Sequence, residues 1–463
     1  MSNDTQISAK VSSVSKSQGE FVSPNMSIEP VSAKTVNDHL SIGGCDTVEL
    51  AKTFGTPLWI MDEQTIVQSV LACKAGLSGY PQTQVFYAGK AFLCLAICHL
   101  IKNMNVGLDV VSEGELYTAV QADMPAKSIL LHGNNKSQEE LNKALEIGAR
   151  IVVDNLAELK SITQIAKTKN TQAKILVRVI PGVTGDTHQH IQTGQEQSKF
   201  GIALSSLPAV VSFIEQNRQY IKFLGLHSHI GSQIHKLQPF TQTIEILAKT
   251  YASIKDDFGL TLSELNVGGG LGIAYTAKDK PIAIETWSRT LAQTVMSEFN
   301  KYNLPLPILL VEPGRALVGT AGVTLYQVGF DKWTSNGTHY VALNGGMADN
   351  PRPVTYQALY TACLANRMGA PKGSQPITLV GKYCEQGDII IKESLIAPED
   401  GDLVAIFDTG AYNASMASNY NRTGRPACVL VADGKAEIII ERETNTDLID
   451  KDKVPKRLLK DSP

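Results

Sequence analysis

The sequence has little that would attach the chain to a membrane, a nucleic acid or an oxidising compartment. Its 42 Lys and Arg residues nearly balance 45 Asp and Glu residues, so no excess of one charge attracts nucleic acid or anionic lipid. The longest nearly apolar run, residues 91–101, is interrupted by His99 and is too short to cross a bilayer. The seven cysteines form no CxxC pair and no Cys/His cluster with zinc spacing. We therefore expect free thiols, a cytoplasmic location and no structural metal.

The two ends of the chain differ in composition from its middle. The N-terminal stretch is rich in Ser, Asn, Gln and Lys and lacks the apolar core of a signal peptide. We expect a disordered tail over residues 1–38, with a cleaved targeting segment as the alternative. Residues 446–463 are highly charged and should form a surface segment. The remaining chain is long enough for two or three domains, each with its own core.

Between these ends, short apolar runs alternate with longer amphipathic stretches. Residues 138–146 show the helical pattern, and Gly148 follows where a helix C-cap is expected. Continuous apolar runs fit strands that are buried on both faces of a parallel sheet. Eight such runs, each followed by helical material, predict an α/β fold, a (β/α)8 barrel over residues 56–315, with a doubly wound open sheet as the alternative. The runs are 85–88, 107–111, 129–132, 151–154, 175–180, 223–230, 265–267 and 308–311.

After residue 315 the helical pattern fades. Short apolar runs separated by Gly, Asn and Asp predict a mostly-β domain, a β-barrel or sandwich, over residues 316–445. This domain carries Cys384 and Glu385. Residues 39–55 are expected to join it.

Polar side chains gather where the predicted barrel strands end. Lys90 follows the first strand, Asp109 lies in the second and His132 ends the third. In barrels of this kind the active site forms at the carboxyl ends of the strands, where the loops converge. We therefore expect one site there. Its other members would be Arg178, His227, His229, Gly268, Gly269, Gly270, Glu312, Gly314 and Arg315.

These residues suit particular chemistry, but each also has a plainer interpretation. A desolvated Lys90 near other cations could form a Schiff base, whereas a solvated lysine would simply begin a helix. Residues 268–272 could bring backbone N–H groups to a phosphate, or form a tight turn. His227 and His229 share one strand face and could bind zinc, although no third ligand is evident. A histidine stacked on a flat cofactor ring, with Ser232 reaching a phosphate, fits equally well.

Two further pairs carry chemical groups. Glu312 could pair with a protonated ring nitrogen and Arg315 could hold an anion through two hydrogen bonds, with a buried structural ion pair as the alternative. Cys384 beside Glu385 would be structural, unless another subunit or domain brings the thiol to the barrel mouth.

Together these motifs resemble the fold-type III pyridoxal-phosphate decarboxylases, and among them the branch that acts on diaminopimelate. Eight short motifs occur in the family's order, over roughly residues 40–445. They are Tyr87-Ala88-Gly89-Lys90-Ala91, Asp109 to Leu116, Ser198-Lys199-Phe200-Gly201, His227 to Gln233, Gly268 to Gly272, Glu312 to Arg315, Cys384-Glu385 and Gly410-Ala411-Tyr412.

The resemblance implies a pyridoxal 5'-phosphate cofactor that Lys90 holds as a Schiff base. It implies that His229 stacks on the cofactor ring and that Glu312 pairs with the ring nitrogen. The other cofactor-binding residues it implies are Asp109, Ser232, Gly268, Gly269, Gly270, Gly314, Arg315 and Tyr412.

The resemblance also implies how substrate is held. Arg315, Arg352 and Tyr356 would bind a substrate carboxylate, Glu385 would contact the distal amino-acid end, and Tyr412 would touch both cofactor and substrate. Cys384 would come from a partner subunit and protonate the carbanion, which makes a head-to-tail homodimer the minimal active unit.

Two guanidinium groups near one carboxylate favour decarboxylation of meso-diaminopimelate to lysine over reactions of ornithine or arginine. The alternatives are a decarboxylase of another diamino acid such as carboxynorspermidine, ornithine or lysine, a racemase, and a non-catalytic relative that binds the cofactor. The sequence departs from the family pattern at Gly89, Glu113, Ala348 and Gln386. These departures leave room for a shifted substrate.

Overall fold

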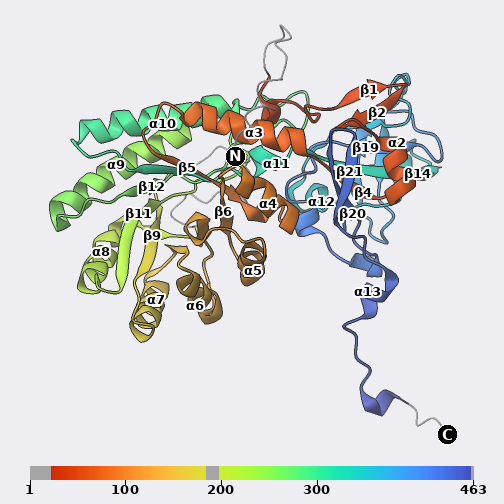
Figure 1. Ribbon diagram of the computed structural model, residues 1–463. Helices are drawn as coiled ribbons and strands as arrows, with labels where there is room; N and C mark the ends of the chain where they lie inside the picture. Colours follow the sequence, from red (N-terminus) through yellow and green to blue (C-terminus); the bar gives the residue numbers. More distant parts are fainter. Residues whose placement is uncertain (1–21, 184–197, 460–463) are drawn as a thin grey trace, which may run out of the picture.

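A closed barrel of eight parallel strands forms the larger part of the protein, and a β-rich domain lies beside it (Figure 1). The computed structural model describes residues 22–183 and 198–459. The predicted (β/α)8 architecture is confirmed, because the last strand of the ring pairs with the first and no open edge is left. In the order of pairing the strands are β9 (Ala173–Ile180), β11 (Ile221–His227), β12 (Glu264–Asn266), β13 (Ile308–Val311), β5 (Thr83–Ala88), β6 (Gly107–Val110), β7 (Ile129–Leu131) and β8 (Arg150–Val153).

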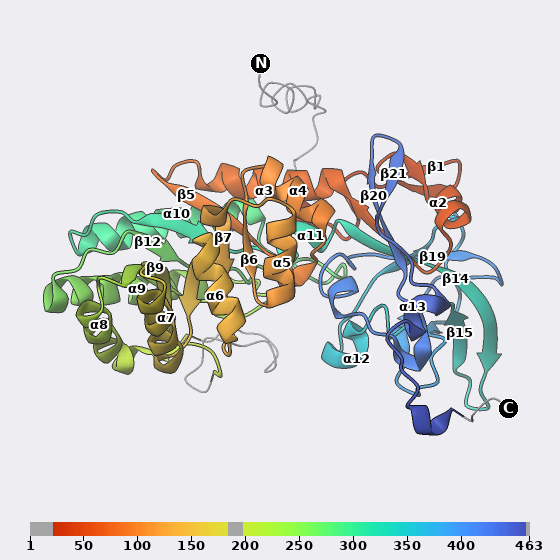
Figure 2. The same cartoon turned by 60° about the horizontal axis from the view of Figure 1, so that its bottom comes forward.

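Helices surround the barrel and cover its apolar outer face (Figures 1 and 2). Their ends follow local sequence signals: Ser137 and Glu140 form a capping box at the start of α6, and Gly148 ends that helix in the left-handed conformation. Asn155 caps α7 in the same way as Ser137 caps α6. The helices are α3 (Glu63–Leu77), α4 (Leu95–Asn103), α5 (Glu113–Gln121), α6 (Gln138–Ile147), α7 (Leu156–Thr168), α8 (Leu207–Gln216), α9 (Gln238–Phe258) and α10 (Ile284–Lys301).

The interior of the barrel is layered by polarity. Its middle is a separate apolar cluster of Phe86, Leu130, Val152, Leu176 and Leu310. At the amino-terminal end of the strands, a buried ion pair joins the first residues of β8 and β12, Arg150 and Glu264, at 3.1 Å.

Side chains on a strand alternate between its faces, so the residue two positions after an interior apolar residue also points inward. In this barrel those positions hold His132, Asp154, Arg178 and Glu312. Along the barrel interior, the alternation therefore gives an ion pair at the amino-terminal end of the strands, an apolar middle, and acidic, basic and histidine side chains at the carboxyl end.

The β-rich domain is built on a nine-stranded sheet that includes a strand from before the barrel. β4 (Leu58–Asp62) pairs with β14 (Gly322–Trp333) on one side and with β20 (Ala427–Ala432) on the other. The prediction that the barrel segment begins at residue 56 is therefore wrong. The other strands are β15 (His339–Leu343), β16 (Ala362–Leu364), β17 (Ile377–Val380), β18 (Ile389–Ser394), β19 (Leu403–Ile406) and β21 (Lys435–Ile440).

The segment before β4 folds onto this domain. β1 (Lys34–Val36), β2 (His39–Ile42) and β3 (Cys45–Asp46) form a small antiparallel sheet, and α2 (Thr47–Phe54) follows. Leu40, Ile42 and Leu50 pack in one apolar cluster with residues of β4, β14 and β20.

Part of the predicted disordered tail is ordered. Residues 1–21 lie outside the described residues, but residues 22–38 include β1 and the 3-10 turn η1 (Pro24–Met26). Asn25 in this turn is fully buried. The prediction is wrong for residues 22–38, because polar residues can be buried when their hydrogen bonds are satisfied by distant backbone groups.

The chain ends in exposed structure. α13 (Asn445–Ile449) and the 3-10 turn η8 (Lys456–Leu458) contain no buried residue. Across residues 22–183 and 198–459, none of the helices combines the length and the apolar content that a membrane span requires.

Candidate active site

A cavity of about 600 Å³ opens where the carboxyl ends of the barrel strands meet the β-rich domain. Its size suits a small-molecule site. The β-rich domain contributes α12 (Arg352–Tyr356), which faces the barrel (Figure 2), and Tyr412. Of the predicted site residues, the cavity is lined by Lys90, Asp109, His132, Arg178, His227, His229, Ser232, Gly270, Glu312, Gly314, Arg315, Arg352, Tyr356 and Tyr412.

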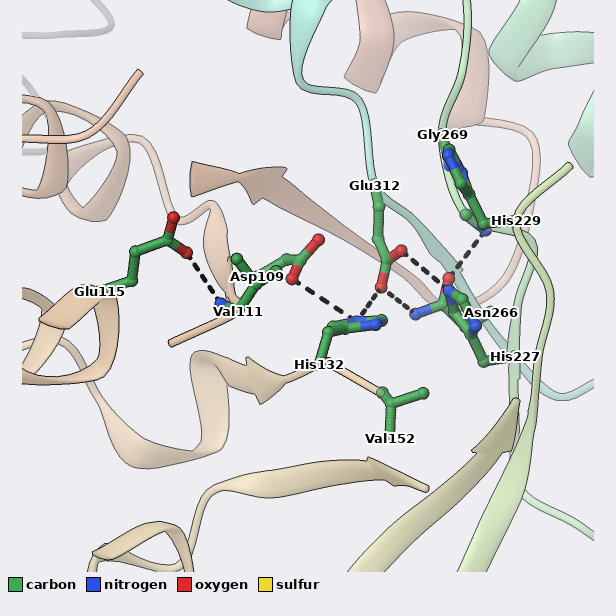
Figure 3. Close-up of polar contacts among 12 residues, drawn as sticks. Asp109, Val111, Glu115, His132, Val152, His227, His229, Asn266, Gly269 and Glu312 are labelled. Atoms are coloured by element: carbon green, nitrogen blue, oxygen red, sulfur yellow. Dashed lines mark hydrogen bonds and ion pairs between the residues drawn. The ribbon is translucent and has the colours of Figure 1, made fainter. Parts of the chain in front are cut away.

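Glu312, in the cavity wall, accepts three hydrogen bonds from side chains (Figure 3). Its Oε1 accepts from His132 Nε2 at 2.9 Å and from Asn266 Nδ2 at 2.6 Å. Its Oε2 accepts from His227 Nε2 at 3.0 Å. Burial alone would raise the pKa of Glu312, but the two histidines outweigh burial and hold this pKa well below its usual value. The carboxylate is therefore a persistent anion with a fixed orientation.

The structure favours a hydrogen-bonding role over the zinc-site interpretation of His227 and His229. His227 lies with His132 and Glu312, and their candidate ligand atoms are within 4.8 Å of one another. Each imidazole Nε2 addresses a separate carboxylate oxygen at hydrogen-bond distance. Burial lowers the pKa of His227 to about 4, so its ring is neutral and donates an N–H. The two imidazoles therefore act as hydrogen-bond donors to the carboxylate of Glu312.

His229 is oriented by the glycine-rich turn that follows β12. Its Nδ1 accepts the backbone N–H of Gly269 at 3.3 Å, so the ring's own proton lies on Nε2. Burial, followed by the charges of Lys90 and Arg178, lowers the pKa of His229 well below its usual value. The cavity wall therefore presents a neutral, flat ring, which suits stacking on a flat ligand.

The three glycines of this turn allow close backbone packing, but only one of them reaches the cavity. A Cβ on Gly269 would lie 2.0 Å from the carbonyl oxygen of Glu312, and the backbone of Gly270 has a φ of +106°. Both positions therefore need glycine. The N–H of Gly268 is donated to Asn266 and that of Gly269 to His229. Only Gly270 of the three lines the cavity, whereas all three were predicted to contact a phosphate.

Lys90 lies in the 3-10 turn η2 (Gly89–Ala91) directly after β5, and its exposed side chain lines the cavity. The carbonyl of Ala91 accepts hydrogen bonds from the backbone N–H of Tyr412 at 2.8 Å and from Ser415 Oγ at 3.0 Å. The β-rich domain thus fixes the turn that carries the lysine.

A buried carboxyl group, Asp109, and a partly buried one, Glu115, interact electrostatically with this lysine. Asp109 Oδ1 is 3.7 Å from His132 Nε2, and Glu115 Oε2 accepts the backbone N–H of Val111 at 2.8 Å (Figure 3). Burial raises the pKa of Asp109 to about 6 and that of Glu115 to about 7, although the charge of Lys90 opposes both shifts. Both groups can therefore exchange protons near neutral pH.

Two arginines share one tyrosine at the other side of the cavity. Arg315 donates to the hydroxyl of Tyr275 at 2.5 Å and to Ser232 Oγ at 3.0 Å. The guanidinium of Arg352 lies 4.7 Å from the ring centroid of Tyr275 and donates to the hydroxyl of Tyr360 at 2.8 Å. In the described part of the chain these partners are hydroxyl groups and rings, so both cations remain available to an anionic ligand.

Cys384 and Glu385 do not line the cavity of their own chain. Both are exposed in the β-rich domain, where the N–H of Cys384 is donated to Asn421 Oδ1 at 2.9 Å and the hydroxyl of Tyr420 lies 3.5 Å from Glu385. A contribution from these residues to a cavity requires a second subunit.

Several site residues were not assigned a role from the sequence. His132 was noted at a strand end, and its position could have suggested a partner for Glu312. Asn266 directly precedes the glycine-rich turn, which is a weaker signal. Tyr275 and Tyr360 lie in loops without a motif, so only the folded chain shows that they contact the arginines.

The residues in the cavity wall suit both the ring and the phosphate of pyridoxal phosphate. The ionised carboxylate of Glu312 in the cavity wall suits a protonated ring nitrogen, and the amine of Lys90 suits an aldehyde. Ser232, Gly270 and Gly314 line the wall where a phosphate would be held. The Nε of Arg315 is buried and has no hydrogen-bond partner among residues 22–183 and 198–459, so a donor is left for a ligand.

Comparisons with known proteins agree with this site. A family model described as "Pyridoxal-dependent decarboxylase, pyridoxal binding domain" matches residues 64–319. The chain is 45% identical over 449 residues to a diaminopimelate decarboxylase of Synechocystis sp., covering 94% of this chain and 95% of the relative. It is 42% identical over 430 residues to the Bacillus subtilis protein of the same name, covering 92% and 97%.

A solved structure gives the same result. The diaminopimelate decarboxylase from M. jannaschii, crystallised in complex with L-lysine, superposes with a TM-score of 0.86 at 34% identity. The match covers 93% of this chain and 99% of that one.

Proposed function

The chain belongs to the diaminopimelate decarboxylases, within the pyridoxal-dependent decarboxylase family, and we propose that it converts meso-diaminopimelate to L-lysine and CO2 with pyridoxal phosphate. One observation of this structure carries the choice of substrate. Two guanidinium groups, which have no carboxylate partner among the described residues, share Tyr275 in the cavity that also holds Lys90 and Glu312. A substrate with a second carboxylate is the ligand that such a pair accommodates.

Bound pyridoxal phosphate supplies an electron sink for the electron pair that is left when the carboxylate departs. Glu312 serves this sink by holding a proton on the ring nitrogen. It can do so because His132, His227 and Asn266 stabilise its anionic form. His229, a neutral ring in the cavity wall, would stack on the cofactor ring.

Lys90 would hold the cofactor. Asp109 and Glu115, whose pKa values are raised to about 6 and about 7, interact electrostatically with the lysine, so each can hold or release a proton in its neighbourhood. Arg315 and Arg352 bind and orient the distal carboxylate of the substrate, and Tyr356 closes the same wall.

The remaining proton donor would be supplied by a second copy of the chain. Cys384 is exposed and carries a free thiol, a group that can donate a proton to the reacting carbon. Glu385 beside it would meet the distal amino group. Both lie outside their own chain's cavity, which supports a homodimer with shared sites. We also assign the protein to the cytoplasm, because all seven cysteines are free.

The direct test is CO2 release from purified protein supplied with pyridoxal phosphate. Meso-diaminopimelate, ornithine, lysine and arginine are tested separately, with Lys90→Ala as the inactive control. We expect release from meso-diaminopimelate alone. Release from ornithine or lysine but not from diaminopimelate would overturn the assignment in favour of another diamino-acid decarboxylase.

A further inference from the structure

Asn25, which precedes both domains in the chain, forms hydrogen bonds to two separate parts of an active-site loop. The loop connects β12 to α10, and Asn25 contacts it from the turn η1. The Asn25 Nδ2 donates to the carbonyl oxygens of Gly272 at 3.1 Å and Ile282 at 2.9 Å. Its Oδ1 accepts the N–H of Ile284 at 3.1 Å. Its backbone oxygen accepts the N–H of Ala274 at 3.1 Å.

These contacts use the whole hydrogen-bonding capacity of the side-chain amide. Both Nδ2 protons are donated, and Oδ1 accepts a second bond from Ser23 Oγ at 2.9 Å. Asn25 is fully buried. An aspartate of the same shape could not make the two donations, and alanine would leave two buried carbonyl groups without their donor.

The loop that Asn25 holds carries the residue on which both arginines converge. Tyr275 follows Ala274 directly, accepts a hydrogen bond from Arg315 and stacks against Arg352. The loop has a second support on the barrel side, where Gln233 exchanges two hydrogen bonds with the backbone of Ile273, at 2.7 and 3.2 Å. Asn25 connects this part of the loop to residues 282–284, and Ser23 Oγ adds a longer bond from the N–H of Ile284 at 3.3 Å.

We propose that Asn25 is a positioning residue for substrate binding: it fastens the β12–α10 loop and so sets Tyr275 between Arg315 and Arg352. The stretch around it is thereby part of the active-site scaffold. The proposal rests on the proposed function in one respect, that the two arginines bind substrate. Because it acts through the loop, loss of Asn25 should weaken substrate binding more than it slows chemistry.

The test compares Asn25→Asp and Asn25→Ala with the parent holoenzyme. We expect faster amide hydrogen exchange in residues 272–284 but not in α7, which lies elsewhere on the barrel. We also expect KM for diaminopimelate to rise roughly tenfold, with kcat changed less than about twofold. Ser27→Ala is the matched control, because the Ser27 hydroxyl bonds to the carbonyl of Glu29 and not to the loop. It should leave both measurements unchanged.

Parent-like exchange in residues 272–284 in both variants would overturn the proposal, and so would faster exchange with an unchanged KM. If neither Asn25 variant folds, Ser23→Ala removes the hydrogen bond from Ser23 Oγ to Asn25 Oδ1 and the weaker one that Ser23 Oγ accepts from the N–H of Ile284 at 3.3 Å, and it must show the same two changes to a smaller degree. Exchange needs no substrate. If the parent fails to decarboxylate diaminopimelate, the proposed function fails while the fastening of the loop is still tested.

Discussion

The Nε2 of His132, at the end of β7, lies 2.9 Å from Oε1 of Glu312, which follows β13. These residues are 180 positions apart in the chain. The closed barrel brings the two strand ends to one mouth, and a histidine without an evident role in the sequence becomes a donor that keeps the acid ionised.

Replacing His132 should therefore weaken the ability of the Glu312 carboxylate to keep the ring nitrogen protonated. We expect His132→Leu to lower kcat by about a hundredfold, as does the loss of other buried donors to catalytic charge. It should also shift the pH at which the absorbance of the bound cofactor titrates. His132→Gln is the matched variant, because its amide can place an N–H near the same position. Equal kcat in parent and His132→Leu would contradict this role for the histidine.

Arg352 should select for the distal carboxylate of the substrate. Arg352→Ala is expected to raise KM for diaminopimelate by about a hundredfold, while any weak turnover of ornithine, which lacks this carboxylate, should be unaffected. Arg352→Lys should recover only part of the loss, because an ammonium group cannot form the paired hydrogen bonds of a guanidinium. Steady-state kinetics with both substrates measure this. An unchanged KM for diaminopimelate would remove the argument for the substrate.

Glu115 should make the protein less stable as pH rises. Its pKa is raised from 4.5 to about 7 in the folded protein. Between these values the folded state holds a proton that the unfolded chain has released, so stability falls as pH increases through this window. Thermal melts from about pH 5 to about pH 8 should show the parent losing a few degrees more than Glu115→Gln. Asp109, raised to about 6, remains in both proteins and cancels in the comparison. Parallel curves would show that Glu115 does not titrate in this range.

A shared active site should be visible by complementation. Lys90→Ala and Cys384→Ala should each be nearly inactive alone, because one lacks the cofactor's amine and the other the proposed proton donor. Mixed after reversible dissociation, they should recover up to about a quarter of parental activity, since half of the random dimers contain one intact site of two. Activity that stays at the level of the single variants would place Cys384 outside the partner's site.

Most of the fold could be predicted because each barrel strand has a recognisable local sequence pattern. Each of the eight predicted runs overlaps a barrel strand, since a strand covered on both faces must be apolar over consecutive residues. The boundary at residue 56 was wrong because no local pattern shows strand pairing. Only the pairing of Leu58–Asp62 with β14 and β20 assigns this buried strand to the other domain.

The sequence by itself determined the kinds of chemical group and the strand ends that carry them: a lysine after β5, an acid after β13 and a pair of arginines. Only the tertiary structure decided the ionisation state, the burial and the hydrogen-bond partners of each group. The ionised state of Glu312 depends on His132, His227 and Asn266, which come from three other strands or strand ends. The buried state of Asn25 depends on a loop about 250 residues away. Burial and hydrogen bonding are properties of the space around a group, and that space is assembled from residues with no fixed spacing in the chain.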